Sequence, residues 1–284
     1  MLRGATTRLL TLVACLSIAD STAAQTPETI KPDRPDVTNG THIVGTGLLQ
    51  VEFGVIYTSD SPGLEQLGSP FTARLGVLDW LEARFGGDGI LVQTDAGGRE
   101  SGFGNLQVGA KLRLWDDPGG VPVLSILPTI NVPTADAEKG LGSGDADYAV
   151  SLLTGSDLGK RAHVDVNYGI GAIGAGGGAP HFVQHAASIS ASVTATAKWN
   201  PYVEMFWFSR QDPGGGTVTA IDGGAIYTVT PRLAFDGGVQ AGLNAAAPDA
   251  AAFGGVSIVV GEILGNHGVH ARRRPPVSRG PHKK

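Results

Sequence analysis

Segments of about ten residues that are apolar at every second position recur over residues 47–260, and they constrain the fold more than any other feature. In the first segment, Leu49 and Val51 alternate with Gln50 and Glu52. Side chains of a β-strand point alternately to opposite faces, so each segment has one apolar face and one polar face. The length and number of these segments predict an all-β fold, a single antiparallel transmembrane barrel with lipid outside and a polar lumen inside.

The start of the chain has the features of a secretory signal. Arg3 and Arg8 precede a short apolar run over residues 9–19, and small residues at 22–24 suit a cleavage site. We therefore expect residues 1–24 to be a cleaved signal peptide. Alternatively, the sequence that ends at Cys15 is similar to a lipoprotein signal, in which case Cys15 would carry lipid. Cys15 is the only cysteine, so a chain cut after residue 24 has no disulfide or thiolate site.

Composition supports a membrane location. Charged residues make up 17% of the chain, below the roughly 25% that is usual in soluble domains. No segment after the signal is long and apolar enough for a transmembrane helix, so residence in a membrane requires a barrel. A soluble β-sandwich is the alternative, and the low charge content argues against it.

The regions flanking the barrel differ from it in composition. Residues 25–46 are polar and rich in turn formers, and we expect a periplasmic N-terminal arm there. Residues 261–284 are basic and rich in proline, which predicts a disordered tail. Its histidines, His267, His270 and His282, could contact periplasmic anions together with the arginines, but a solvated tail is the simpler interpretation.

Twelve strands are predicted, at about residues 47–58, 69–78, 81–88, 103–115, 121–133, 145–155, 162–173, 182–194, 201–209, 217–229, 232–243 and 251–260. The connections after odd-numbered strands are mostly long and rich in glycine: 59–68, 89–102, 134–144, 174–181, 211–216 and 244–250. Those after even-numbered strands, such as 79–80, 116–120 and 230–231, are mostly tighter. This alternation is typical of bacterial outer-membrane barrels, and the even strand count predicts that both termini are periplasmic.

Nearly every charge within a strand falls on the inward face. The predicted lumen-facing polar residues are Glu52, Arg74, Glu82, Arg84, Lys111, Arg113, Asp147, His163, Asp165, Glu204, Asp222 and Asp236. An Arg or Lys on the lipid face costs about 2–4 kcal/mol at mid-bilayer, so these charges specify the register. Their mixed signs predict pairing across a partly filled lumen, and we expect them to set pore selectivity. No apolar path is evident among the inward positions.

Aromatic residues gather near the predicted short connections. Trp80, Trp115, Trp199 and Tyr202 all lie there. Barrels carry girdles of aromatic side chains at the membrane interfaces, so we expect these four to be interface anchors.

Three stretches carry a resemblance to a known family. They are Asp33-Arg34-Pro35-Asp36 with the first strand up to Gly54, the stretch from Gly102 to Lys111, and the stretch from Leu233 to Asn244. The chain resembles the outer-membrane transporters grouped in the MetA-pathway phenol-degradation family. The resemblance implies a barrel with a transport role and no catalytic residues. One departure is that the last predicted strand ends at Val260, without the terminal aromatic residue that such barrels usually have.

Three further motifs have simpler explanations. Residues 169–174 match the dinucleotide-binding pattern GxGxxG, but they lie within a predicted strand rather than before a helix. His163, Asp165 and Asn167 could be metal ligands or belong to a lipid hydrolase, yet their parity places them in the lumen. Asp145 and Asp147 are too few for a calcium site, so we expect no metal and no cofactor.

The sequence thus predicts an outer-membrane barrel that is a passive channel or transporter for small molecules, with aromatic or hydrophobic solutes suggested only by the family. The expected partners are outer-membrane lipids, lipopolysaccharide, small solutes and the barrel-assembly machinery, with no nucleic acid. A closed structural barrel without an open pore is the first alternative. An outer-membrane lipid-modifying enzyme is the second, although no nucleophile is evident at the rim.

Overall fold

The structure, a computed structural model, describes residues 29–34, 37–60, 63–116 and 122–264. The regular elements in these ranges are all β-strands. They are β1 (Leu48–Asp60), β2 (Leu64–Gly68), β3 (Phe71–Leu78), β4 (Leu81–Gly87), β5 (Ile90–Asp95), β6 (Gly98–Phe103), β7 (Leu106–Trp115), β8 (Val123–Val132), β9 (Asp147–Leu158), β10 (Ala162–Ile173), β11 (Phe182–Val193), β12 (Trp199–Phe208), β13 (Val218–Thr230), β14 (Leu233–Gly242) and β15 (Ala250–Glu262).

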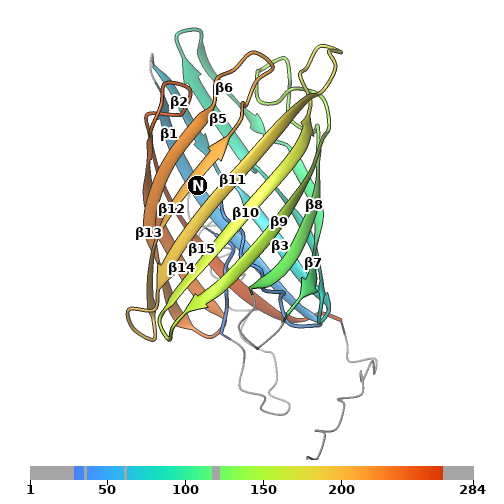
Figure 1. Cartoon of the computed structure of the whole chain (residues 1–284). Coiled ribbons are helices and arrows are strands. Elements are labelled where there is room, and N and C mark those ends of the chain that lie inside the picture. The colour runs from blue at the N-terminus through green and yellow to red at the C-terminus, as the bar shows by residue number, and fades with distance from the viewer. Residues whose placement is uncertain (1–28, 35–36, 61–62, 117–121, 265–284) are drawn as a thin grey trace, which may run out of the picture.

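The strands form one closed antiparallel barrel (Figure 1). Each strand pairs with its neighbours, and β1 pairs with β15 to close the wall from Leu48↔Glu262 to Ser59↔Ala250. We call each complete strand of the wall a stave, and three staves are interrupted and consist of two segments each. These are β2 with β3, which both pair with β1, then β4 with β5, and then β6 with β7. Along these staves, β5 pairs with β2 and β6, and β4 pairs with β3 and β7. The fifteen segments are therefore twelve staves, which confirms the predicted strand number.

The interruptions lie side by side on three neighbouring staves. They fall at residues 69–70, 88–89 and 104–105, where Ser69 donates to the Ile90 carbonyl and Gly104 donates to the Gly89 carbonyl. Gly89 has a φ of 64°, and a Cβ there would lie 2.1 Å from the Ser69 carbonyl oxygen. Only glycine fits this bend, because it has no side chain and tolerates a positive φ.

Two predicted long loops are largely strand, which corrects the sequence analysis. Residues 59–68 contain the end of β1 and all of β2, and residues 89–102 contain β5 and most of β6. These segments extend the wall as hairpins beyond the bend, with Gln66 paired to Gln93 and Gln93 paired to Glu100. Their polar composition suggested loops, but the hydrogen bonds of the adjacent staves continue into them.

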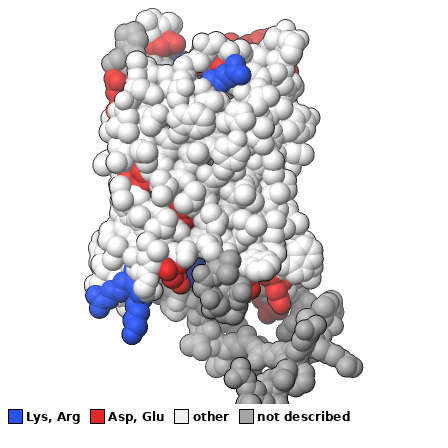
Figure 2. All heavy atoms as spheres, in the orientation of Figure 1, with Lys and Arg blue, Asp and Glu red and all other residues white. Residues whose placement is uncertain are grey.

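The outer surface is apolar, as the alternation predicts. Its large exposed side chains include Phe53, Phe85, Val108, Val166, Tyr168 and Ile170. Figure 2 shows a largely uncharged wall with charges concentrated at its two ends and a few acidic atoms at mid-height. Alternate residues of the same strands are buried, among them Glu52, Arg74, Glu82 and Lys111. The register of the strands therefore places apolar side chains on the outer face and polar side chains in the lumen.

Both described ends of the chain lie at the same end of the barrel. At the N-terminal end, the Ile30 amide donates to the Pro231 carbonyl oxygen in the connection between β13 and β14, at 2.8 Å. At the C-terminal end, the amides of Ile263 and Leu264 both donate to the carbonyl oxygen of Gly47, which precedes β1, at 2.9 and 3.4 Å. The tight connections at residues 79–80 and 231–232 separate paired strands, as expected. The predicted signal peptide, Cys15 and the tail histidines lie outside the described residues.

The glycine pattern at residues 169–174 belongs to β10 and its end, where Gly169 pairs with Ser151 and Ala186. It is therefore part of a barrel stave and precedes another strand. The described residues contain no helix long and apolar enough to cross a membrane.

The register makes a test on the lipid face of β10 possible. Replacing Val166, which is 39% exposed on the outer face, by arginine places a charge in the bilayer. We expect Val166→Arg to lower the free energy of unfolding by about 2–4 kcal/mol, measured by denaturant unfolding in lipid vesicles. Val166→Leu is the matched control and should unfold like the wild type. Equal stability of the Arg and Leu variants would contradict the assigned faces.

Candidate functional site

The N-terminal arm, residues 25–46, runs inside the barrel wherever the structure describes it, at 29–34 and 37–46 (Figure 1). The Ile30 amide donates to the Pro231 carbonyl oxygen at 2.8 Å, and the Ile30 side chain packs on Ala234 and Val259. The sequence analysis predicted a periplasmic arm, and the structure places it in the lumen. The physical reason is that its backbone groups and its charged side chains find partners on the inward faces.

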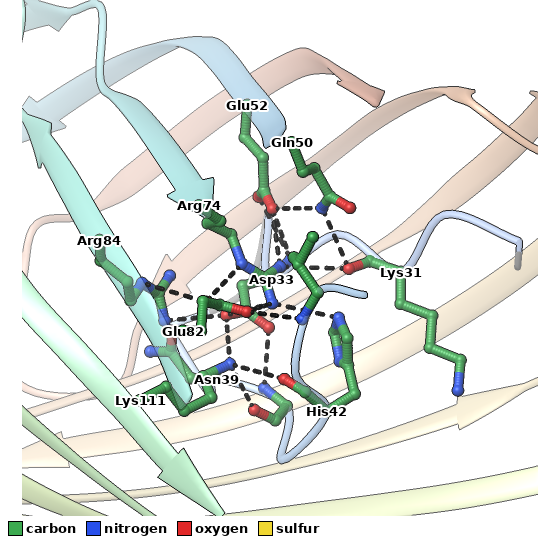
Figure 3. Close-up of polar contacts among 12 residues, drawn as sticks. Lys31, Asp33, Asn39, His42, Gln50, Glu52, Arg74, Glu82, Arg84 and Lys111 are labelled. Atoms are coloured by element: carbon green, nitrogen blue, oxygen red, sulfur yellow. Dashed lines mark hydrogen bonds and ion pairs between the residues drawn. The ribbon is translucent and has the colours of Figure 1, made fainter. Parts of the chain in front are cut away.

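Asp33 is the centre of the contacts on one wall (Figure 3). Its Oδ2 atom lies 2.6 Å from Lys111 Nζ, 2.9 Å from Arg84 Nη1 and 3.5 Å from Arg74 Nη2. The side chains of Arg74 and Lys111 are fully buried, and that of Arg84 is 10% exposed. The three cations come from β7, β4 and β3, so one carboxylate of the arm ties three staves together.

Two carboxylates of the same wall hold the arm's backbone. Glu52 accepts hydrogen bonds from the amides of Asp33 and Arg34, at 3.2 and 3.0 Å. Glu82 accepts from the Val44 amide at 2.9 Å. Buried carboxylates need such donors, because an unpaired ion in the interior is strongly unfavourable. The carboxylates of the wall and the backbone amides of the arm therefore satisfy each other's hydrogen bonds.

Arg74 links these two carboxylates within the wall. Its Nη1 lies 2.8 Å from Glu52 and its Nε lies 2.9 Å from Glu82. It also donates to the Lys31 carbonyl oxygen and contacts His42 Nε2 at 3.2 Å. The predicted charge pairing across the lumen is thus a pairing between neighbouring strands of one wall, and Asp33 of the arm supplies a further carboxylate.

The tip of the arm binds a different wall of the barrel. The amides of Val37 and Thr38 donate to Glu204 of β12 at 2.8 and 2.5 Å, and the Thr38 hydroxyl contacts both Glu204 and Ser188. Glu204 pairs in register with Asp222 on β13. The arm therefore crosses the lumen from the wall of β3, β4 and β7 to the wall of β11 and β12, and it returns to join β1.

Glycines make room for the arm. A Cβ on Gly54 or Gly255, which pair across β1 and β15, would lie 2.1 or 2.6 Å from atoms of the Arg34 side chain. That side chain reaches Asp236 of β14 at 3.4 Å. A Cβ on Gly76 would lie 2.2 Å from the Val44 carbonyl oxygen. Alanine at position 76 would force the arm's backbone away, so the inward glycines shape the seat of the arm.

Four of the predicted lumen residues lie apart from the arm contacts. Arg113 pairs with Asp116 at 2.8 Å. Asp147 accepts hydrogen bonds from Asn131 and from the Gly174 amide at 3.1 and 2.8 Å. These two residues are bonded to neighbouring staves and turns.

The other two are His163 and Asp165, near the short connections. His163 lies between Asp157 and Asp165, at 2.7 and 3.2 Å, and its side chain is 38% exposed. In the described part of the chain, no group of three or more His, Cys, Asp or Glu side chains is arranged to hold a metal ion.

One part of the lumen wall is apolar, which corrects the sequence analysis. Phe182, Phe206, Val218 and Ala220 are all buried. The rings of Phe206 and Phe208 meet edge to face with centroids 5.8 Å apart. These residues share the inward parity of polar residues such as Glu204 and Asp222, so they line the same lumen as the charges.

A cavity of ≈ 130 Å³ lies beside the tip of the arm and is lined by residues of β9, β10, β11 and β12. Its lining includes Val37 and Asn39 of the arm, Ser151, Asn167 and Phe208. A space of this size is close to the roughly 150 Å³ that holds a benzene molecule in other proteins.

One predicted interface anchor is wrong. Tyr202 is buried, at 8% exposure, because it shares the inward parity of Glu204. Trp80, Trp115 and Trp199 are about half exposed near the short connections, as expected of anchors. Proximity to a short turn does not separate the two faces. Parity places Tyr202 inward, and Trp115, which has the parity of Lys111, is exposed because the register shifts between Arg113 and Trp115.

Two groups of the arm have perturbed pKa values. Burial opposes the ionisation of Asp33, but the charges of Arg74, Lys111 and Arg84 outweigh it and hold the pKa of that carboxyl well below its usual value. Burial and the neighbouring Arg74 hold the pKa of His42 well below 6.5, so His42 is neutral at pH 7. Neutral His42 accepts from Arg74 through Nε2.

These features define a closed twelve-stranded membrane barrel whose lumen holds its own N-terminal arm. The chain belongs to the family described as "Putative MetA-pathway of phenol degradation", whose model matches residues 32–259. No protein with a curated description matches the sequence.

The fold is similar to that of solved structures, among them an outer membrane channel and a porin. An outer membrane channel from Pseudomonas putida F1 is 13% identical, with a TM-score of 0.64 over 79% of this chain and 100% of that chain. The NanC porin is 11% identical, with a TM-score of 0.53 over 74% of this chain and 98% of that chain.

Acidification should loosen the arm through His42. Because the pKa of His42 is lowered in the folded state, protonation of His42 below about pH 6.5 disfavours the seated arm. The charged groups that face His42 are the cations Arg74 and Lys111 and the carboxylates Asp33 and Glu82. Asp33 contributes only at still lower pH, below its usual pKa of 3.8. Between pH 7 and 5, we expect amide-exchange protection of residues 37–44 to fall by up to about tenfold per pH unit.

The control is His42→Gln, which lacks the titrating group but keeps a polar side chain. After correction for intrinsic exchange, its protection should stay constant over the same range of pH. A wild-type arm whose protection does not change between pH 7 and 5 would contradict the buried neutral histidine.

Proposed function

We propose that the protein is a passive outer-membrane channel for small molecules, and that the seated arm is its closed state. The observation that carries the proposal is the way the arm is held. Its contacts are mostly hydrogen bonds and ion pairs from Asp33, Thr38 and Val44 to lumen side chains. Polar contacts of this kind can be exchanged for water or solute, unlike a close-packed apolar core.

We propose that both termini are periplasmic. In support, both described ends lie at the end of the barrel where the connections are tight, with Ile30 bonded to Pro231 and Ile263 bonded to Gly47. Short turns face the periplasm in outer-membrane barrels of known structure. The arm then enters the lumen from the periplasmic side, and the hairpin of β5 and β6 extends toward the outside.

We propose that the charges lining the lumen set selectivity once the arm moves. Seven of them bind the arm or its side chains in the closed state: Glu52, Arg74, Glu82, Arg84, Lys111, Glu204 and Asp236. Aromatic solutes are a further part of the proposal. The apolar wall around Phe206, the neighbouring cavity and the family's description support it.

The two alternatives make different demands on the structure. A closed structural barrel needs an arm that never leaves. A lipid-modifying enzyme needs a nucleophile beside His163 at a lipid-facing rim. His163 is instead bonded to Asp157 and Asp165 on the inward side, so we propose that the protein has no enzymatic activity.

Conductance in planar bilayers tests the channel. We expect the wild type to conduct little, and a variant lacking residues 29–44 to conduct several-fold more, because the lumen is freed. If the deletion does not fold, Glu204→Ala releases only the tip and should give more frequent openings than the wild type. A folded deletion variant that remains silent would establish the structural barrel instead.

A further inference from the structure

Three cations of the barrel wall converge on a single oxygen atom of the arm. Lys111, Arg84 and Arg74 lie 2.6, 2.9 and 3.5 Å from Asp33 Oδ2 (Figure 3). All three belong to barrel strands, and only the carboxylate belongs to the arm. The wall therefore forms a receptor for a carboxylate, and Asp33 is its occupant in this structure.

The two arginines of the receptor are held in place by the wall itself, whereas Lys111 also donates to the Gly40 and His42 carbonyl oxygens of the arm. Arg74 is fixed by Glu52 and Glu82 at 2.8 and 2.9 Å, two contacts that do not involve the arm. Arg84 also lies 3.9 Å from Glu82. The arginine positions are thus set before any anion binds, which lowers the entropic cost of binding.

The charges around the receptor define what it accepts. The wall contributes three cations, Arg74, Arg84 and Lys111, but only two carboxylates, Glu52 and Glu82. With Asp33 the cluster is neutral, and without Asp33 it keeps one uncompensated positive charge in a buried place. Such a charge is costly unless an anion pairs with it. A monovalent anion restores neutrality, whereas a dianion would overshoot it.

We propose that Arg74, Arg84 and Lys111 form a binding site for a solute that carries one carboxylate, and that such a solute takes the place of Asp33 when the arm moves. The proposal rests on the proposed channel function and names its substrate class. Asp33 is then a tethered competitor for the site. With the arm seated, Arg84 is the only one of the three that is partly exposed, at 10%.

The experiment is rescue of Asp33→Ala by a free carboxylate. The full-length variant is refolded in lipid vesicles, and its apparent melting temperature is followed by heat-dependent gel mobility in sodium acetate and in sodium chloride at equal ionic strength. We expect Asp33→Ala to melt below the wild type, and acetate to raise its melting temperature saturably by about 2–4 °C relative to chloride. The wild type, whose site is filled, should show no difference between the two salts.

Glu204→Ala is the matched control, because it loosens the arm at the opposite wall and leaves Asp33 in its site. Acetate should not stabilise this variant. Lys111→Met combined with Asp33→Ala should abolish the rescue. If the double variant does not fold, the reversal potential of single Asp33→Ala channels provides the second measurement, and acetate should permeate better relative to chloride than in the wild type.

Equal melting temperatures of Asp33→Ala in acetate and chloride would overturn the carboxylate site. Because melting is measured without conduction, this failure is distinct from failure of the channel. A barrel that acetate rescues but that never conducts would keep the site and remove the channel. A barrel that conducts without rescue would do the reverse.

Discussion

The burial of Asp33 among Lys111, Arg84 and Arg74 is the interaction on which the lumen depends. Each of these four charges would be strongly unfavourable inside the barrel without the others. Their contact fixes the arm against β3, β4 and β7, and from there the chain can reach Glu204 on the far wall. The position of the arm in the lumen therefore depends on electrostatic pairing, in addition to the apolar packing of Ile30 on Ala234 and Val259.

The barrel wall is built to receive the arm. Gly54, Gly76 and Gly255 face inward where a single methyl group would collide with Arg34 or with the backbone at Val44. Glycine in a strand usually weakens it and marks the close approach of another group. Here the approaching group is the N-terminal arm, so the inward glycines and the inward charges serve one purpose.

Most of what could be predicted from the sequence came from the alternation of apolar and polar residues along each strand. Alternation identifies the barrel, the twelve staves and the inward position of Glu52, Arg74 and Lys111, because a strand has only two faces. It could not place the arm, whose partners are backbone amides and residues far away in the sequence, such as Glu204. Proximity to turns misplaced Tyr202, and polar composition hid β2, which forms by extension of neighbouring hydrogen bonds. The charged residues Asp33, Arg34 and Asp36 before the first strand, together with the lumen charges of mixed sign, were the available signal for the arm.

A disulfide between the arm and the far wall tests the central claim most directly. The Thr38 and Ser188 hydroxyl oxygens lie 2.8 Å apart, and a chain cut after residue 24 contains no other cysteine. If the arm crosses the lumen, Thr38→Cys with Ser188→Cys should cross-link under mild oxidation in folded barrels in membranes. Thr38→Cys with Ser192→Cys, four residues further along the same face of β11, should cross-link far less. Folded barrels in which the first pair stays reduced would show that the lumen does not hold the arm.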